Sequence, residues 1–285
     1  MGFALGTPNL FARLTPTLAG GSWASAAPLA YLLTRNRAER ARSSDALTAS
    51  TLLTIDWGSA QTARVLSICG HNLSSAATVR WKRGSTLSGT DVYDSTALQA
   101  WNFTPIVYDG DHWHVSIVQA AATSARYERL EIIDTANADG YVELARLFIG
   151  DVLEPEGDAD MGARYTDRDL GTKERTESGT PVVIARPVLS GAVAVLGDLT
   201  PAEARRFRSM RTWAGTTEEV WVSPDIDDAE VTQADGFVGT FDELSPVETA
   251  SPARRGVPVA FTMRPFSNVN SSWSYVVPRY TDCVL

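Results

Sequence analysis

Short apolar segments with turn residues between them are the feature that most constrains how this chain can fold. Between residues 52 and 150 the segments read LLTIDW, ARVLSICG, ATVRWKR, HWHVSIVQA, RYERLEIID and VELARLFIG. Within RYERLEII, alternate positions place Glu128, Leu130 and Ile132 on one side of a strand. Turn sequences such as YDGD and ANADG separate the segments. The pattern predicts six to eight short strands and no helix over residues 45–150, arranged as an antiparallel β-sandwich.

The second half of the chain begins with an acidic segment and continues with further strand-like segments. Residues 151–162, DVLEPEGDADMG, hold five carboxylates in twelve positions, which predicts an acidic linker. Beyond it, TPVVIARPVLSGAVAVLGDL predicts two strands, and EEVWVSPD, GFVGTFDEL and GVPVAFTMRPF predict more. We therefore predict three parts: a sandwich domain over residues 1–150, the linker over 151–162, and a β-rich domain, sandwich or barrel, over 163–285.

One helix is predicted in the second domain, at about residues 201–214. Thr200 is placed as its N-cap, with Pro201 at the first helical position, Glu203 completing a capping box and Gly215 ending the helix. Its apolar residues form one stripe flanked by Trp213. The helix is therefore expected to lie on a sheet.

Composition excludes several classes of function. The net charge of -9 argues against a nucleic-acid-binding protein, since phosphate recognition needs a dense field of Lys and Arg. We see no apolar run that could span a bilayer and no secretory signal, so we expect a soluble protein made in the cytoplasm. With only Cys69 and Cys283, a disulfide framework is not expected.

Two stretches suggest chemistry at first sight. Cys69 and His71 would share one face of a strand, but GHN after the apolar run is typical of a turn. We therefore interpret Cys69 as a buried structural thiol beside a corner. His112 and His114 in DGDHWHV could contribute to a weak metal site, although a solvated strand edge explains them as well.

No catalytic motif is recognisable elsewhere. Carboxylate pairs are expected by chance among 34 acidic residues, and no nucleophile elbow, phosphate-binding glycine loop or dinucleotide fingerprint occurs. Asp-rich sandwich loops leave calcium binding open as an alternative. We predict a non-enzymatic protein with no catalytic residue, no cofactor and no metal.

Aromatic residues gather in the middle of the first domain. A sugar ring can stack on an exposed aromatic side chain, whereas most Trp residues of a sandwich belong to its core. Either role is open for each member of the set Trp81, Tyr93, Trp101, Tyr108 and Trp113, which we name as candidate glycan contacts.

Three segments carry a resemblance to known families. Residues 53–81, LTIDWGSAQTARVLSICGHNLSSAATVRW, resemble the opening of discoidin-like carbohydrate-binding jelly rolls. RLFIGDVLEPEGD is similar to a segment of tail proteins in tailed bacteriophages and prophages. The order of TPAEARRFRSM, EVWVSPD and VAFTMRPF resembles the ring-forming domain of siphophage distal tail proteins. The resemblance implies a mainly β chain with an N-terminal jelly roll and a ring-forming second domain carrying one helix.

The resemblance also implies a function and partners. We expect a structural component of a phage tail tip or baseplate, located in the virion and assembled in the host bacterial cytoplasm. Its expected partners are further copies of itself in a ring of six, the tail tube protein, the tail hub with other tail-tip proteins, and host surface polysaccharide contacted by the sandwich. A lectin-like adhesin that binds cell-surface polysaccharide is the alternative. Neither hypothesis includes nucleic-acid binding or membrane insertion.

Overall fold

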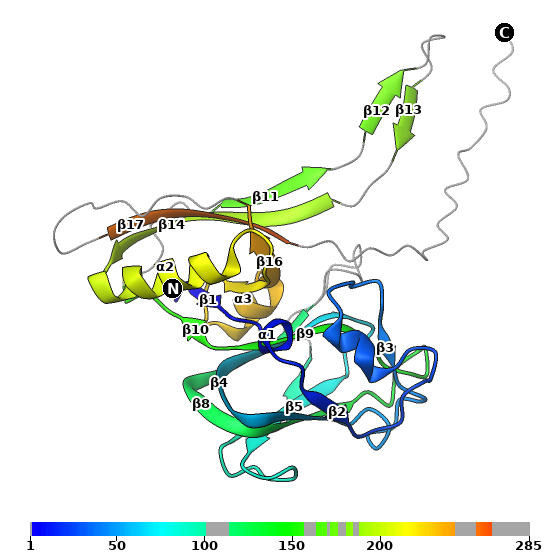
Figure 1. Cartoon of the computed structure of the whole chain (residues 1–285). Coiled ribbons are helices and arrows are strands. Elements are labelled where there is room, and N and C mark those ends of the chain that lie inside the picture. Colours follow the sequence, from blue (N-terminus) through cyan, green and yellow to red (C-terminus); the bar gives the residue numbers. More distant parts are fainter. Residues whose placement is uncertain are drawn as a thin grey trace, which may run out of the picture.

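The computed structural model describes residues 2–100, 114–156, 164–169, 172–175, 181–184, 188–242 and 255–263. Two large antiparallel sheets dominate the molecule, one of eight strands and one of seven, and a separate two-stranded ribbon extends beyond them (Figure 1). The predicted mainly β fold is confirmed. No helix among the described residues has the length and apolarity needed to cross a membrane.

The eight-stranded sheet forms the N-terminal sandwich. Its elements are α1 (Leu10–Arg13), β2 (Thr17–Ala19), η1 (Leu29–Leu33), β3 (Ala41–Arg42), β4 (Leu53–His71), β5 (Thr78–Gly84), β6 (Tyr93–Asp94), β7 (Leu98–Gln99), β8 (His114–Ile133) and β9 (Glu143–Gly150). The strand order is β3-β9-β4-β8-β5-β6, with β2 paired to β4 and β7 paired to β5.

Two long bent strands build both layers of the sandwich. The first part of β4, Leu53–Asp56, pairs with β2 and with Tyr127–Leu130 of β8, whereas Val65–Cys69 pairs with β9 and with His114–Val118 of β8. The pairing of β4 with β8 shifts register between these parts, where Gly58 has a φ of 75°. The segments LLTIDW and ARVLSICG, predicted as separate strands, are thus one strand, because backbone pairing continues through the bend.

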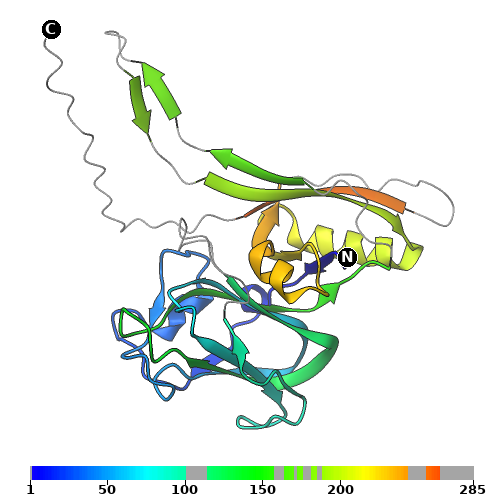
Figure 2. The same cartoon turned by 180° about the vertical axis from the view of Figure 1, so that it is seen from behind.

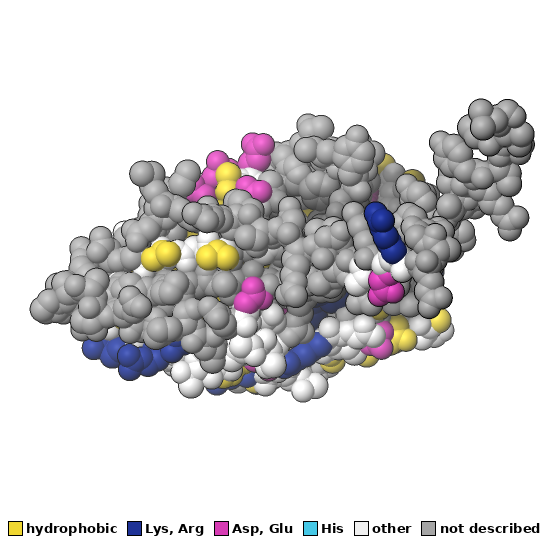
Figure 3. All heavy atoms as spheres, turned by 90° about the horizontal axis from the view of Figure 1, so that it is seen from above, with side chains coloured by type: hydrophobic (Ala, Val, Ile, Leu, Met, Phe, Trp, Pro, Cys, Tyr) yellow, Lys and Arg dark blue, Asp and Glu magenta, His cyan; other side chains and the backbone are white. Residues whose placement is uncertain are grey.

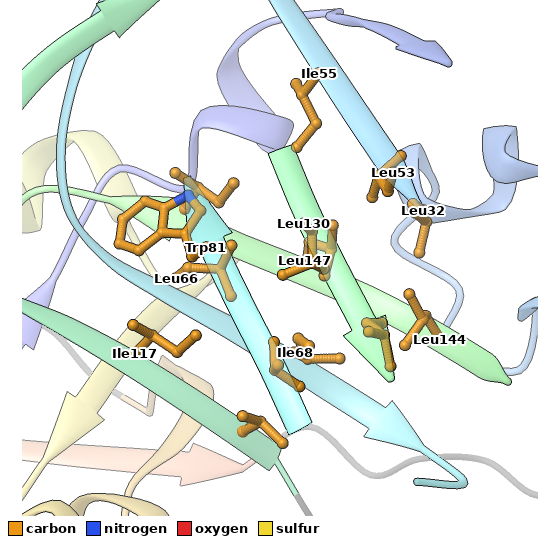
Figure 4. Close-up of a cluster of buried hydrophobic side chains, with 14 of the residues drawn as sticks. Leu32, Leu53, Ile55, Leu66, Ile68, Trp81, Ile117, Leu130, Leu144 and Leu147 are labelled. Carbon is orange, nitrogen blue, oxygen red and sulfur yellow. The ribbon is translucent and has the colours of Figure 1, made fainter. Parts of the chain in front are cut away.

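The core of the sandwich lies between these two layers (Figure 4). Leu53 and Ile55 come from the first part of β4, and Leu66 and Ile68 from its second part; all four are fully buried. The other strands add Val79, Trp81, Val115, Ile117, Leu130, Ile132, Leu147 and Ile149. Period-two alternation in RYERLEII therefore identified the buried side of that part of β8 correctly.

The seven-stranded sheet forms the second unit. Its elements are β1 (Ala4–Gly6), β10 (Val152–Leu153), β11 (Arg164–Asp169), β14 (Val188–Leu199), α2 (Pro201–Ala214), β15 (Val220–Ser223), α3 (Ala229–Ala234), β16 (Phe237–Phe241) and β17 (Arg255–Met263), in the strand order β10-β1-β15-β16-β17-β14-β11. The ribbon consists of β12 (Thr172–Arg175) and β13 (Pro181–Ile184).

The predicted helix is α2, and its ends are as expected. The Thr200 hydroxyl accepts from the Glu203 backbone N–H at 3.3 Å, and the Glu203 carboxylate accepts from the Thr200 backbone N–H at 2.7 Å. Phe207 and Met210 are buried in the core that α2 forms with the sheet. The short helix α3, capped by Asp228, was not predicted, because six residues are too few to show a helical repeat.

The first strand of the chain belongs to the second unit. In β1, Leu5 pairs with Leu153 of β10 on one side and with Val222 of β15 on the other. Residues 4–6 therefore depart from the predicted sandwich of residues 1–150, and residues 152–153 of the predicted linker form a strand. The physical reason is burial: Leu5 and Leu153 lie in the apolar core under α2.

Replacing a core leucine tests the two-layer arrangement. We expect Leu130→Ala to lower the free energy of unfolding by about 2–5 kcal/mol, because Leu130 is buried between the layers and its removal leaves a cavity. Leu87→Ala is the matched control: Leu87 is 52% exposed, so a change within about 0.5 kcal/mol is expected. Urea unfolding followed by circular dichroism measures both, and equal losses would contradict the assigned core.

Candidate functional site

The candidate glycan-contacting aromatics do not form one exposed surface among the described residues. Trp81 is fully buried, and its indole N–H donates to the carboxylate of Glu128. The Tyr93 ring packs edge-on against it, with 5.4 Å between the centroids, and stays half-buried; burial raises the pKa of its hydroxyl. Trp101, Tyr108 and Trp113 lie outside the described residues. Trp81 is thus a core residue, and Tyr93 keeps part of its ring accessible.

The stretch around Cys69 is a structural corner. Burial raises the pKa of the Cys69 thiol to about 11, so the thiol is protonated at neutral pH and is a poor nucleophile. β4 ends at His71, after Gly70 with a φ of 67°, and Asn72 holds the following turn by donating to the Tyr141 carbonyl at 3.0 Å. The interpretation of Cys69 as a buried structural thiol is confirmed.

Neither histidine of the described chain points to a metal site. His71 is buried, and its Nδ1 accepts from the Leu73 backbone N–H at 3.2 Å. His114 is also buried, with Nε2 3.3 Å from the Thr232 carbonyl oxygen. His112 lies outside the described residues. Within the described ranges, His, Cys, Asp and Glu side chains do not gather in threes around a point that could hold a metal ion.

A buried ionic cluster joins the sandwich to the second unit. Glu219, directly before β15, accepts hydrogen bonds from Arg146 of β9 at 2.9 and 3.0 Å and from Asn9 at 2.7 Å. The Arg37 guanidinium lies 3.8 Å from the other carboxylate oxygen. Burial opposes ionisation of Glu219, but the two arginines and these hydrogen bonds outweigh it and hold its pKa below the usual range. The carboxylate therefore stays charged inside the protein.

Two further hydrogen bonds hold the arginines of this cluster. Arg146 donates to the Leu32 carbonyl within the sandwich at 2.8 Å, and Arg37 bridges the two units by donating to the Val238 carbonyl of β16 at 3.1 Å. An apolar cluster lies beside them, with Cys69 and Phe148 from the sandwich and Trp221 from β15. Together, these contacts fix the position of the second unit on the sandwich.

Sequence reasoning missed this junction. Its only signal was a charged residue at the edge of, or within, an apolar run: Arg146 in VELARLFIG and Glu219 in EEVWVSPD. Such a residue indicates a buried partner but does not identify it. The two residues are 73 positions apart, and only the folded chain brings them together.

A groove lies between α2 and the N-terminal segment, and we call it the α2 groove. Its volume is about 370 Å³. Arg206, Ser209, Met210 and Trp213 line it from α2, and the other wall is formed by Thr7, Pro8, Arg13, Asp151 and Leu153. The volume falls in the range of small-molecule or side-chain binding pockets.

The fold positions this groove through the apolar face of α2. Because Phe207 and Met210 are buried in the sheet core, Trp213 and Arg206 are turned to the rim. Trp213 is 39% exposed, a large fraction for an indole. Arg206 donates to Asp151 and to the Val152 carbonyl, each at 2.8 Å, which ties the helix to β10.

Comparisons with known proteins give only partial likenesses. No protein-family model matches the chain, and no curated protein matches its sequence. A CBM32 module from a Clostridium perfringens family 31 glycoside hydrolase is 13% identical at a TM-score of 0.38, covering 50% of this chain and 99% of the module. The family 32 module of C. perfringens NanJ with galactose gives 13% identity, a TM-score of 0.36 and coverage of 51% and 98%. The lectin domain of lectinolysin with Lewis B antigen is 13% identical at a TM-score of 0.37, covering 51% of this chain and 98% of that domain.

His71 should make the protein less stable in mild acid. Burial first, then His114 and Arg40, lower its pKa to about 3, whereas an unfolded histidine has a pKa near 6.5. Below about pH 6.5 the unfolded chain takes up a proton that the folded chain does not, so stability present above this pH is lost on acidification towards pH 3.

The measurement is urea unfolding at pH 7 and pH 5. We expect His71 to contribute a loss of about 2 kcal/mol between these values, at about 1.4 kcal/mol per pH unit below its unfolded pKa. His71→Gln keeps an acceptor for the Leu73 N–H and removes this titration, so its loss should be smaller by that amount. The same loss in both proteins would contradict the assignment.

Removing the charge of Glu219 should weaken the junction. We expect Glu219→Gln to lower the free energy of unfolding by about 3–5 kcal/mol, because Arg37 and Arg146 would remain buried without a compensating charge. Glu218→Gln is the matched control, since the ion pair of Glu218 with Arg35 is on the surface and such pairs contribute about 0–1 kcal/mol. Thermal unfolding of both variants measures the difference.

Proposed function

We propose that the chain is a non-enzymatic structural subunit that assembles with copies of itself in the tail tip of a tailed bacteriophage. The phage assignment rests on the sequence resemblance of residues 146–158 and of the order of elements after residue 200. The assembly role rests on the ribbon. In this proposal, the second unit forms the ring between tail tube and hub, and the sandwich braces the tip in the virion.

The ribbon is the observation that carries the assembly role. β12 and β13 pair only with each other in the described chain, as a sheet of two strands beyond the body of the protein (Figures 1 and 2). A two-stranded ribbon without a third strand or a covering layer is marginally stable in water. A neighbouring subunit would supply the missing surface, as expected for a protein that works in an assembly.

A second feature supports the same role. The junction buries Arg146, Glu219 and Trp221 between the units, so the sandwich and the ribbon-bearing sheet belong to one rigid body. Rigid subunits that repeat one interface geometry form a closed ring when the rotation per copy divides a full turn. The described titratable groups of the junction are held in ion pairs and hydrogen bonds, which suits a structural role better than a catalytic one.

The test is the mass of the full chain in solution. Light scattering with negative-stain imaging should show rings, and replacing residues 172–184 with a short Gly-Ser turn should give monomers with unchanged far-ultraviolet circular dichroism and urea midpoint for the body. A wild-type chain that stays monomeric at about 100 µM, alone and with tail tube protein, would refute the proposal. The Leu87→Ala variant, with the same purification history, should assemble normally.

The second candidate function is that of a lectin-like adhesin for cell-surface polysaccharide. The observation that favours it is Tyr93 on β6, which is half-buried at the edge of the sandwich and could present its ring to a sugar. Retention of a monomeric chain on bacterial polysaccharide, lost in Tyr93→Ala and kept in Tyr127→Ala, would favour this function over assembly.

A further inference from the structure

We propose that the α2 groove of one copy receives the acidic segment Asp225–Glu230 of a second copy, so that the chains associate head to tail. This inference rests on the proposed function and names the surfaces that would close the ring. It commits to one occupant, a second copy of this chain, because both halves of a complementary contact are present on each copy.

The composition of the groove is that of a protein interface. Trp213 and Arg206 stand at the rim, Met210 and Leu153 are buried below them, and Arg13 adds a second exposed guanidinium. Trp, Met and Arg are the residue types enriched in interface cores and among the side chains that dominate binding. Asp151 also lines the groove and accepts from Arg206 at 2.8 Å, so these lining residues carry one positive charge in excess. The surface is therefore suited to a partner that is acidic and in part apolar.

The acidic segment is rigid and exposed. Asp225 accepts from the Gly2 backbone N–H at 2.8 Å, and Asp228 caps α3 by accepting from the N–H groups of Glu230 and Val231. These contacts fix the backbone, while the side chains of Asp227 and Glu230 are exposed. The segment therefore presents two carboxylates without having to become ordered on binding.

The groove and the acidic segment lie at opposite ends of β1. The Ile226 N–H donates to the Gly2 carbonyl at 2.7 Å at one end, and Thr7 lines the groove at the other. Five extended residues span about 16 Å, so the segment does not reach the groove of its own copy. Contact between the two requires a second molecule.

The two charged surfaces also face in different directions. α2 lies in front in Figure 1, whereas α3 lies in front in the opposite view of Figure 2. Seen from above in Figure 3, Lys and Arg side chains gather at one edge of the second unit, and Asp and Glu side chains gather at the opposite edge. A contact between unlike surfaces is heterologous, and it closes into a ring when the rotation per copy divides a full turn.

Charge makes this pairing selective. A chain with a net charge of -9 repels its own copies in general, so a stable contact needs local complementarity of this kind. Arg13 on one copy, beside the Arg206–Asp151 ion pair, would face Asp227 and Glu230 on the next. Association should consequently weaken as salt increases.

Charge reversal on the full chain tests the pairing. We expect Arg13→Glu and Asp227→Lys each to weaken self-association by roughly tenfold or more, because each places like charges opposite one another. The double variant Arg13→Glu/Asp227→Lys should regain association. An equimolar mixture of the two single variants should also regain it, since alternating copies then match at every contact. Analytical ultracentrifugation measures the self-association of the two single variants, the double variant and the mixture.

Controls separate this inference from the proposed function. Trp213→Ala should reduce association, whereas Leu87→Ala on the sandwich should not, and circular dichroism with urea unfolding establishes that every variant folds. Rings that survive both single reversals and are lost only on removal of the ribbon would overturn the inference and leave the assembly role intact. A wild-type chain that never associates would refute the proposed function itself.

Discussion

The buried carboxylate of Glu219 is the interaction on which the arrangement of the two units depends. It receives hydrogen bonds from Arg146 of the sandwich and Asn9 of the N-terminal segment, with Arg37 close by. Buried ion pairs contribute little net stability, but a wrong arrangement leaves a charge uncompensated, so they favour one relative placement of the parts. The sandwich and the seven-stranded sheet keep one relative placement for this reason.

Strands β4 and β9 contribute to the cores of both units. The outer face of β4 and β9, with Cys69 and Phe148, is covered by the second unit, while the inner face, with Leu66 and Ile68, packs in the sandwich core. A layer buried on both faces needs apolar residues at consecutive positions, which explains the continuous runs ARVLSICG and ARLFIG.

The sequence was informative wherever the determining contacts are local. Period-two alternation located the buried side of β8, with Glu128 beside Leu130 and Ile132, and the capping residues located α2. It was not informative where partners are distant. The pairing of β1 with β15 joins residues more than 200 positions apart, and the Arg146–Glu219 contact joins two sequence segments that show no common pattern.

The exposure of the aromatic residues could not be predicted from the sequence either. Trp81 and Trp213 are equally plausible surface residues in sequence, yet one is fully buried and the other is 39% exposed. The difference arises from register: Trp81 lies on the inner side of β5 and donates to the buried Glu128, whereas Trp213 lies beside the apolar stripe of α2. Exposure of an aromatic depends on which face of its element is covered, and that is set by tertiary packing.

Part of one face of the seven-stranded sheet is exposed on β14, the strand that follows the ribbon in the chain. Ala194 and Leu196 of β14 are buried under α2, whereas the alternating Val193 and Val195 are 37% and 41% exposed on the other face. Among the described residues, the sandwich contacts that face near β1, β15 and β16, through Trp221 and Val238. The exposed valines therefore lie on the strand that leads from the ribbon into the body. A neighbour that covered them would bury apolar area on the same unit that carries α2.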